Sequence, residues 1–189
     1  MAASCFNRAR LWQGGHVPLL IREAASQADY DAFGRVIRAY VEWCRERYSA
    51  MPWLVDLAFG YQALDQELTE LAAKYGPPQG RILLAFEDGH LAGGVAYRRL
   101  SESICEMKRM FVFKEHAGRG IGRQLCRRLI AEAAAAGFST MRLDTSRDMR
   151  EAIALYRSAG FAACAPYIDY PERLKPMILF MELALSARG

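Results

Sequence analysis

Residues 111–123 read FVFKEHAGRGIGR, in which an apolar strand pattern leads through three alternate glycines into the start of a helix. Because Gly118, Gly120 and Gly122 have no side chains, the backbone N–H groups of this turn can approach an anion closely. The N-terminal end of the following helix and two neighbouring arginines add positive charge at the same place. The stretch therefore predicts a strand–turn–helix unit that binds a pyrophosphate. A plain tight turn at the start of a helix is the alternative.

The spacing of the glycines separates this turn from two common nucleotide-binding loops. A dinucleotide-binding turn has the pattern Gly-x-Gly-x-x-Gly after a first strand, with an acidic residue about 20 positions later. Here the pattern is Gly-x-Gly-x-Gly and the preceding strand is the third that we predict, so NAD fits poorly. No Gly-Lys-Ser or Gly-Lys-Thr occurs in the chain, which excludes a P-loop.

Two more motifs flank the turn, because residues 105–112 read CEMKRMFV and residues 152–161 read AIALYRSAGF. Together with residues 120–122, they resemble three motifs of the GNAT superfamily of N-acetyltransferases, in the family's order. These motifs are the Glu-x-Lys-Arg-x-Tyr/Phe-Val strand of a bacterial subgroup, the Arg/Gln-x-x-Gly-x-Gly/Ala cofactor loop, and the Ala-Ile-x-Leu-Tyr-x-x-x-Gly-Phe helix and turn. The Arg/Gln position of the loop falls on Ala117. This departure should weaken cofactor binding rather than abolish it, because the family's loop contacts are mostly backbone N–H groups.

The patterns along the chain agree with the fold that this resemblance implies. Strands are predicted at residues 81–87, 91–100, 104–113, 141–143 and 177–185, with a hairpin turn at Asp88-Gly89. Helices are predicted from Ser26, over residues 61–73, between Gly122 and Gly137, and over residues 152–158, while residues 48–60 are expected to be irregular. The resemblance implies an α/β (α+β) fold with a mixed, mostly antiparallel central sheet of about six to seven strands flanked by about four helices.

Length and composition fit one folded domain. With 189 residues, 52% of them hydrophobic and 24% charged, the chain is long enough for a sizeable core and unlike a disordered protein. We expect a single domain over residues 1–189, with residues 1–22 as an N-terminal arm. The apolar runs are too short for a membrane span or a signal peptide, so we expect a cytoplasmic protein without a membrane partner. The five scattered cysteines predict free thiols and no metal site.

The resemblance implies acetyl-CoA as the cofactor. The residues expected to bind it are Met110, Phe111, Val112, Ala117, Gly118, Arg119, Gly120, Ile121, Gly122, Arg123 and Met149. In the strand predicted at residues 104–113, the alternation of polar and apolar residues is interrupted near Arg109, as a β-bulge would cause. In GNAT proteins the sheet splays at this place, and pantetheine adds to the freed backbone like an extra strand. The alternative is an ordinary central strand with a solvated Lys108–Arg109 pair.

Acetyl transfer to an amine needs a base for the attacking nitrogen and an acid for the departing thiolate. Glu106 is the candidate base, because it is a carboxylate within a mostly apolar strand; a structural ion pair with Lys108 or Arg109 is the alternative. Tyr156 occupies the family's tyrosine position and is the candidate acid, with a role as an ordinary core tyrosine as the alternative. Cys105 adjoins Glu106 but points to the opposite face, so we expect direct attack in a ternary complex rather than an acetyl-cysteine.

The binding site for the acceptor amine is indicated only by residue type and by the position of the acceptor site in other GNAT proteins. Candidate substrate residues are the aromatic Tyr40, Trp53 and Tyr167, which suit an amine or belong to the core, together with Arg98, which could hold a carboxylate. The predicted function is N-acetylation of a primary amine of a small molecule, with a non-catalytic acyl-CoA-binding sensor as the alternative. The arginines that follow the glycine turn are better explained by the cofactor's phosphates than by nucleic acid, so no nucleic-acid partner is expected. The sequence leaves a homodimer open and does not identify the acceptor.

Overall fold

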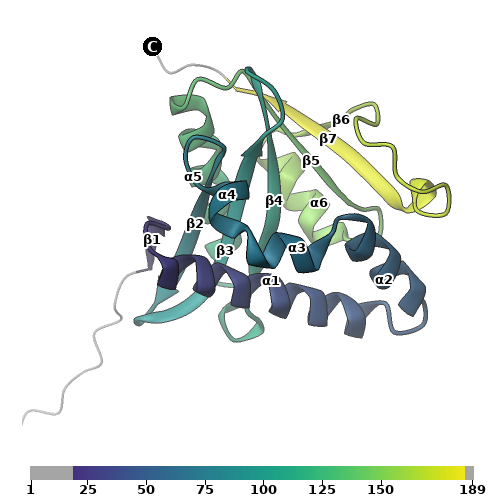
Figure 1. The fold of residues 1–189 in the computed structure, drawn as a ribbon, viewed down its shortest axis with the longest axis horizontal. Coiled ribbons are helices and arrows are strands. Elements are labelled where there is room, and N and C mark those ends of the chain that lie inside the picture. The colour runs from purple at the N-terminus through teal and green to yellow at the C-terminus, as the bar shows by residue number, and fades with distance from the viewer. Residues whose placement is uncertain (1–18, 186–189) are drawn as a thin grey trace, which may run out of the picture.

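The computed structural model describes residues 19–185 of the chain. A seven-stranded sheet in the order β1-β2-β3-β4-β5-β7-β6 forms its centre (Figure 1). The strands are β1 Leu20–Glu23, β2 Gly80–Glu87, β3 His90–Arg99, β4 Ile104–Val112, β5 Thr140–Ser146, β6 Ala162–Ala163 and β7 Ile178–Ala184. Strands β4 and β5 run parallel, and the other neighbouring pairs in the described part of the chain are antiparallel. The predicted mixed, mostly antiparallel sheet is confirmed.

Helices cover both faces of this sheet (Figure 1). The α-helices are α1 Gln27–Arg47, α2 Pro52–Tyr61, α3 Leu64–Thr69, α4 Leu71–Tyr75, α5 Ile121–Ala135 and α6 Arg150–Ser158, and short 3₁₀ helices occupy Lys114–His116 and Lys175–Met177. On one face, α1 and α4 bury apolar side chains such as Phe33 and Tyr75 against β2 and β3. On the other face, α5 and α6 bury Leu125 and Tyr156 against β2 to β5. Each face therefore has its own apolar core.

The N-terminal half contains more helices than the sequence predicts. The segment 48–60, expected to be irregular, contains α2, which begins at Pro52; proline favours the first position of a helix because its ring presets φ. The single helix expected over residues 61–73 is instead two short helices. Ala63 has a left-handed backbone (φ 50°) that separates α2 from α3, and Glu70 leaves helical geometry between α3 and α4. The additional helix α2 and the division of the expected helix into α3 and α4 bring the expected four or so helices to six α-helices within residues 19–185.

The predicted N-terminal arm lies mostly outside the described residues, but its last residues form β1. This strand pairs antiparallel with β2 at the edge of the sheet, a pairing that the sequence analysis did not predict. Ser26 then begins α1 with a complete capping box: its hydroxyl accepts from the backbone N–H of Asp29, and the Asp29 carboxylate accepts from the backbone N–H of Ser26.

Strands β4 and β5 separate along their length, which opens the middle of the sheet. Their pairing covers Ile104–Glu106 with Thr140–Arg142, although β4 continues to Val112 and β5 to Ser146. Beyond this point the register of β4 against β3 shifts, and Arg109 has φ 59°, so the predicted bulge is present. A side chain at Gly93 would place its Cβ 2.4 Å from the carbonyl oxygen of Phe111, so only glycine fits opposite the bulge.

Candidate functional site

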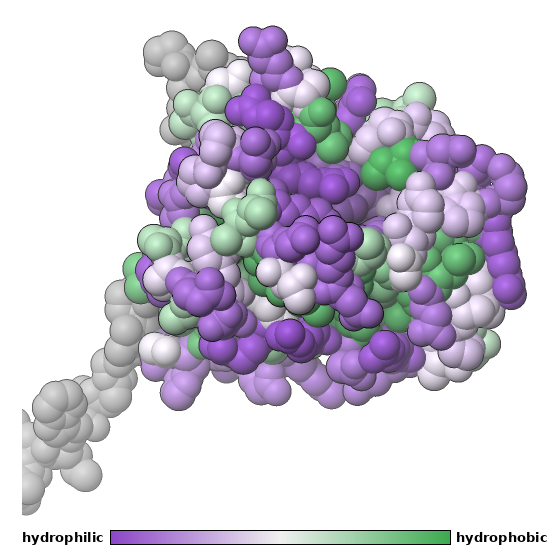
Figure 2. Space-filling view, viewed as in Figure 1, coloured by the Kyte–Doolittle hydropathy of each residue, from purple (hydrophilic) through white to green (hydrophobic). Residues whose placement is uncertain are grey.

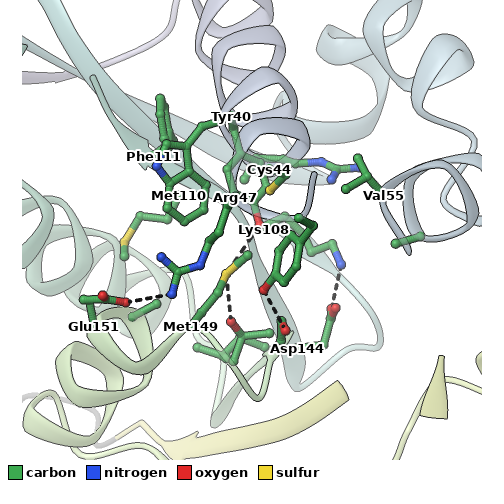
Figure 3. A pocket seen from close by; sticks show the side chains of 18 of the residues that line it. Tyr40, Cys44, Arg47, Val55, Lys108, Met110, Phe111, Asp144, Met149 and Glu151 are labelled. Carbon is green, nitrogen blue, oxygen red and sulfur yellow. Dashed lines mark hydrogen bonds and ion pairs between the residues drawn. The ribbon is translucent and has the colours of Figure 1, made fainter. Parts of the chain in front are cut away.

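A cavity of about 530 Å³ occupies the opening between β4 and β5. From the α1–α2 side it is lined by residues such as Tyr40, Tyr48 and Phe59, and from the α5–α6 side by Gly122 and Tyr156. Elements on both faces of the sheet therefore contribute to its walls. Figure 3 shows its side chains converging from α1, β4, β5 and α6. On the face covered by α1 to α4, hydrophobic residues come to the surface mainly over α2, one of the walls of the cavity (Figure 2).

Aromatic rings form the wall of the cavity on the α1 side. The ring of Tyr40 lies 5.8 Å from that of Phe59 and 5.7 Å from that of Phe111, measured between centroids. Trp43 extends this cluster, with its ring 6.1 Å from that of Phe111. The separations suit edge-to-face and tilted packing, which holds the rings in place. Tyr40 thus lies at the cavity, and its contact with a substrate stays a prediction.

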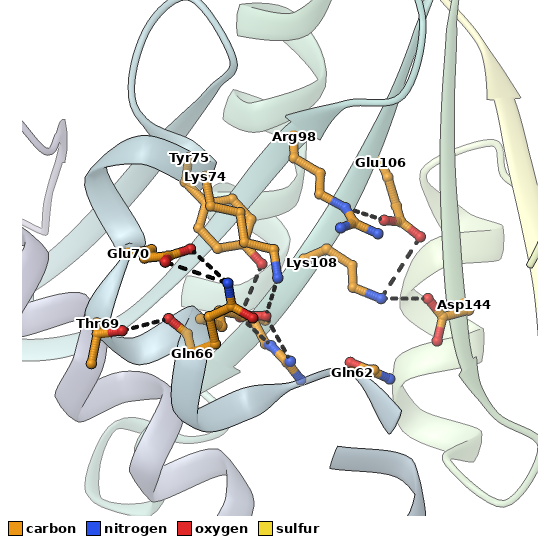
Figure 4. Close-up of polar contacts among 12 residues, drawn as sticks. Gln62, Gln66, Thr69, Glu70, Lys74, Tyr75, Arg98, Glu106, Lys108 and Asp144 are labelled. Atoms are coloured by element: carbon orange, nitrogen blue, oxygen red, sulfur yellow. Dashed lines mark hydrogen bonds and ion pairs between the residues drawn. The ribbon is translucent and has the colours of Figure 1, made fainter. Parts of the chain in front are cut away.

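The floor of the cavity is polar. Lys108 Nζ donates to Asp144 Oδ1 at 2.7 Å, and the Tyr170 hydroxyl donates to Asp144 Oδ2 at 2.9 Å. Both Lys108 and Asp144 line the cavity, at the point where β4 and β5 have separated (Figures 3 and 4). Burial alone would raise the pKa of Asp144, but the charge and hydrogen bond of Lys108 and the hydrogen bond of Tyr170 lower it below its usual value. Asp144 is therefore a buried anion.

Glu106 lies beside this floor but outside the cavity lining. Its side chain is fully buried, with Oε2 2.7 Å from Arg98 Nε, Oε1 3.0 Å from the Tyr167 hydroxyl and Oε1 3.7 Å from Lys108 Nζ (Figure 4). Three predicted site residues, Glu106, Arg98 and Tyr167, are thus brought together, but in a polar cluster next to the cavity rather than in its wall. Of the two ion-pair partners that the sequence analysis considered, Lys108 lies at 3.7 Å and Arg109 pairs elsewhere, while Arg98 is the cation that hydrogen-bonds to Glu106.

Tyr156 faces the cavity from α6, on the side opposite the aromatic wall. Its ring packs against Phe161, and its hydroxyl makes no hydrogen bond to any residue between 19 and 185. Burial raises the pKa of Tyr156 well above that of an ordinary phenol, and the charge of Asp144 raises it further. The phenol therefore keeps its proton at physiological pH and is free to donate it into the cavity.

A buried ion pair holds the bulge at the cavity. Arg109 donates from Nε to Glu67 Oε1 at 2.7 Å and from its guanidinium to Glu67 Oε2 at 3.0 Å. Tyr75 and Lys74 also donate to the same carboxylate. Glu67 belongs to α3, so this bidentate pair links α3 to the strained residue of β4. The sequence analysis offered Glu106 or solvent as the partner of Arg109; the partner in the structure is instead Glu67, which is 42 residues away.

The residues predicted to bind the cofactor divide into two groups. Met110, Phe111, Val112, Ala117, Gly122 and Met149 line the cavity, whereas Gly118, Arg119, Gly120, Ile121 and Arg123 lie beyond it along the turn and the first part of α5. Gly118 and Gly120 have φ near 79° and 78°, the left-handed region that glycine permits. Arg119 pairs with Glu87, which also contacts His116. Ile121 is part of the core.

Trp53 and several unpredicted residues complete the surroundings. Trp53 lies outside the cavity lining and stacks under the guanidinium of Arg173, 3.5 Å from its ring centre. Arg47 lies at the cavity and donates to the carbonyl oxygen of Asp148 at 2.9 Å, which joins α1 to the start of α6. Sequence reasoning missed Asp144 and Arg47. The alternation Met141, Arg142, Leu143, Asp144 would have shown a polar strand face, but such a face ordinarily indicates solvent.

The chain belongs to the GNAT family of acetyltransferases, whose model matches residues 48–161. It is 33% identical over 160 residues to an uncharacterized N-acetyltransferase of Schizosaccharomyces pombe, which covers 84% of this chain and 90% of that protein. It is 39% identical over 127 residues to the IAA acetyltransferase of Azospirillum brasilense, 66% of this chain and 80% of that protein. Among solved structures, the PaiA N-acetyltransferase of Thermoplasma acidophilum in complex with coenzyme A shares the fold, with a TM-score of 0.64 and 18% identity over 89% of this chain and 99% of that one.

The protein is accordingly an acetyl-CoA-dependent acyltransferase. The residues of the site fit this co-substrate: β4 has an edge that β5 leaves unpaired, the cavity follows this edge, and the glycine turn with the start of α5 lies at one end of it. Within residues 19–185, no helix combines the length and the hydrophobicity that crossing a membrane requires.

Gly122 tests the cofactor end of the cavity. A methyl group there would lie 3.7 Å from Val112 Cγ2 and 3.8 Å from Leu155 Cδ2, which is ordinary contact, so it narrows the cavity without straining the fold. We expect Gly122→Ala to weaken acetyl-CoA binding about tenfold, or about 1.4 kcal/mol, in isothermal titration calorimetry. Its matched control is Gly60→Ala on α2, where a methyl group meets nothing within 4 Å. Equal affinity in the two variants would contradict this placement.

Proposed function

We propose that this acetyltransferase transfers the acetyl group of acetyl-CoA to the primary amine of a small molecule, by direct attack of the amine in a ternary complex. The observation that carries the proposal is a cavity whose lining residues come from both faces of the sheet. The turn and Tyr156 lie on one side of this cavity, and an aromatic wall with a polar floor lies on the other. Two substrates that enter from opposite faces would meet between β4 and β5.

The cysteines support direct attack rather than a covalent acetyl-enzyme. Cys105 lies outside the cavity lining, and burial raises the pKa of its thiol to about 12. Cys44 does line the cavity, but burial raises the pKa of that thiol to about 11, so the nucleophilic thiolate is scarce at neutral pH.

The four cysteines in the described part of the chain are free, which supports the cytoplasm as the protein's location.

The chain's own residues would divide the work as follows. Backbone groups of Met110 and Val112, on the free edge of β4, would align the pantetheine arm, and the N-terminal end of α5 would hold the pyrophosphate. Acetyl-CoA supplies an acetyl group activated as a thioester. The Tyr156 hydroxyl would donate its proton to the sulfur as the C–S bond breaks. The relatives of Schizosaccharomyces pombe and Escherichia coli are named as N-acetyltransferases, which supports nitrogen as the acceptor atom.

The test is acetyl-CoA turnover against a panel of primary amines, with the free thiol detected. The panel contains amino acids, polyamines, aminoglycosides, peptides and the arylalkylamine phenethylamine. We expect thiol release that depends on one class of amine. Tight binding of acetyl-CoA in calorimetry, without turnover on any amine, would favour a non-catalytic sensor instead. Absence of acetyl-CoA binding would contradict the proposal as a whole.

A further inference from the structure

The carboxylates that line the cavity, within the described residues, are those of Asp144 and Glu151. They differ strongly in position. The side chain of Glu151 is 78% exposed at the rim and lies 3.5 Å from Arg47, whereas that of Asp144 is 8% exposed on the floor. Figure 3 shows Glu151 on α6 and Asp144 at the base of the cavity. A carboxylate that meets a substrate away from water is therefore available at Asp144.

The carboxylate of Asp144 can accept further hydrogen bonds. Each carboxylate oxygen has two lone-pair sites, and each oxygen of Asp144 uses one of them, for Lys108 or for Tyr170. Two acceptor sites thus remain for the N–H groups of an amine. The Glu106 carboxylate differs, because Arg98, Tyr167 and the nearby Lys108 surround it outside the cavity.

Asp144 and Tyr156 contribute to the same cavity from opposite sides. Asp144 projects to the face of the sheet covered by α1, where Lys108 meets it, and Tyr156 comes from α6 on the other face. They are near enough for the charge of Asp144 to raise the pKa of the Tyr156 phenol. An amino group at Asp144 would therefore share one cavity with the Tyr156 hydroxyl.

The walls above Asp144 are apolar, which indicates the rest of the substrate. The cavity lining that shares the α1–α2 side with Asp144 includes Tyr40, Tyr48, Leu54, Val55 and Phe59, and Ile178 of β7 adds a further apolar side chain. An apolar or aromatic substrate body would be desolvated here with a favourable free energy of roughly 25 cal/mol per Å² of buried surface. A polycationic amine would leave its remaining charges against these side chains.

We infer that Asp144 holds the amino group of an apolar primary amine, such as an arylalkylamine, and accepts its proton during acetyl transfer. This inference rests on the proposed function, since it concerns the same reaction, and it gives the role of base to Asp144 in place of Glu106. The nitrogen forms its bond to the acetyl carbon as the C–S bond breaks. The ammonium first passes its extra proton through the Asp144 carboxylate to water, which leaves the neutral amine that attacks. The second nitrogen-bound proton leaves by the same route after the attack, and the thiolate takes a proton from Tyr156, which water restores, so that one proton is released in net.

Several groups surround Asp144 and enter any pH profile. They are Lys108, Arg109 and Glu106 on β4, Tyr167 and Tyr170 on the segment before β7, and Tyr156 on α6. Burial raises the pKa of all three tyrosines far above neutrality, so they keep their protons. The group that changes charge most between neutral and alkaline pH is then the substrate ammonium itself.

The experiment measures acetylation of phenethylamine at neutral and at alkaline pH by wild type, Asp144→Asn, Glu106→Gln and the exposed control Asp169→Asn. We expect Asp144→Asn to lower kcat/KM about 100-fold at neutral pH. The difference in kcat/KM between wild type and Asp144→Asn should become smaller at alkaline pH, where more of the phenethylamine is already the neutral amine. At neutral pH, the loss of kcat/KM in Asp144→Asn should also be smaller with β,β-difluorophenethylamine, a less basic amine of nearly the same shape. Calorimetry should show unchanged acetyl-CoA binding and weaker phenethylamine binding to the coenzyme A complex.

Each other outcome has a definite meaning. A deficit that is equal at both pH values and for both amines would make Asp144 structural and overturn the inference. The same pattern in Glu106→Gln but not in Asp144→Asn would return the role of base to Glu106. Turnover of polyamines or aminoglycosides without phenethylamine would overturn the apolar class of acceptor. Thiol release by the wild type in the absence of any amine would contradict the proposed function itself. This outcome can be told apart from a failure of the Asp144 inference, because it does not depend on any variant.

Discussion

Replacing Tyr156 by phenylalanine should lower kcat for acetyl transfer about 100- to 1,000-fold, because the departing thiolate then loses the proton donor that faces it from α6. The hydroxyl makes no hydrogen bond to the rest of the described chain, so its removal should leave the fold unchanged. The measurement is steady-state thiol release, with kcat and the KM for acetyl-CoA determined separately. We expect the loss in kcat alone, because the phenyl ring keeps its contact with Phe161.

Tyr97→Phe is the matched control for this substitution. Tyr97 is also a buried tyrosine in the same apolar core, but it lies outside the cavity lining. Its variant should retain wild-type kcat. A Tyr156→Phe enzyme with full activity would show that the thiolate leaves without help from α6, and the acid would then have to be water.

Glu67→Gln should lower the free energy of unfolding by about 3–5 kcal/mol, because it leaves the buried guanidinium of Arg109 without its counter-charge. The side chains of Arg109 and Glu67 are 3% and 1% exposed, so water cannot replace the lost partner. The measurement is equilibrium unfolding in urea. Glu70→Gln, on the exposed side of the same helical segment, is the control and should change stability by less than about 0.5 kcal/mol.

The same pair predicts how stability depends on acid. Burial alone would raise the pKa of Glu67, but the hydrogen bonds and charges of Arg109 and Lys74 outweigh it and lower the pKa from 4.5 to about 2. A depressed pKa in the folded state contributes stability above the pKa of the unfolded chain, and this is lost as pH falls from about 4.5 towards 2. The loss amounts to about 3 kcal/mol. Wild type should therefore lose stability more steeply than Glu67→Gln in this range, and parallel curves would contradict the role given to the pair.

Much of the fold was predictable because its signals are local. The hairpin at Asp88-Gly89, the end of α5 at Gly137 and the bulge at Arg109 all depend on what a few neighbouring residues permit, and the backbone angles confirm them. The breaks around α2, α3 and α4 were not predicted. They arise from single residues such as Ala63, whose left-handed backbone no motif announces.

In the candidate site, too, the residues that belong to local motifs were predicted, whereas Asp144, which belongs to none, was not. The glycine turn and Tyr156 carry recognisable motifs, so their neighbourhood at one cavity could be anticipated from the family resemblance. Glu106 also belongs to a motif, yet its carboxylate is engaged by Arg98 and Tyr167 beside the cavity. Asp144 carries no motif and lies on the cavity floor. Residue type and spacing do not show which of the two carboxylates, Glu106 on β4 or Asp144 on β5, lines the cavity where these strands separate.

By itself, the sequence determined the family, the acetyl donor, the mixed sheet and the position of its bulge. These follow from backbone preferences and motifs within about ten residues of one another. Tertiary structure alone decided that Glu67 pairs with Arg109 across 42 residues, that Glu106 is enclosed, and that Asp144 lines the cavity. The physical reason is that burial and pairing of charges depend on which distant segments pack together, and the free energy of a carboxylate depends on that packing.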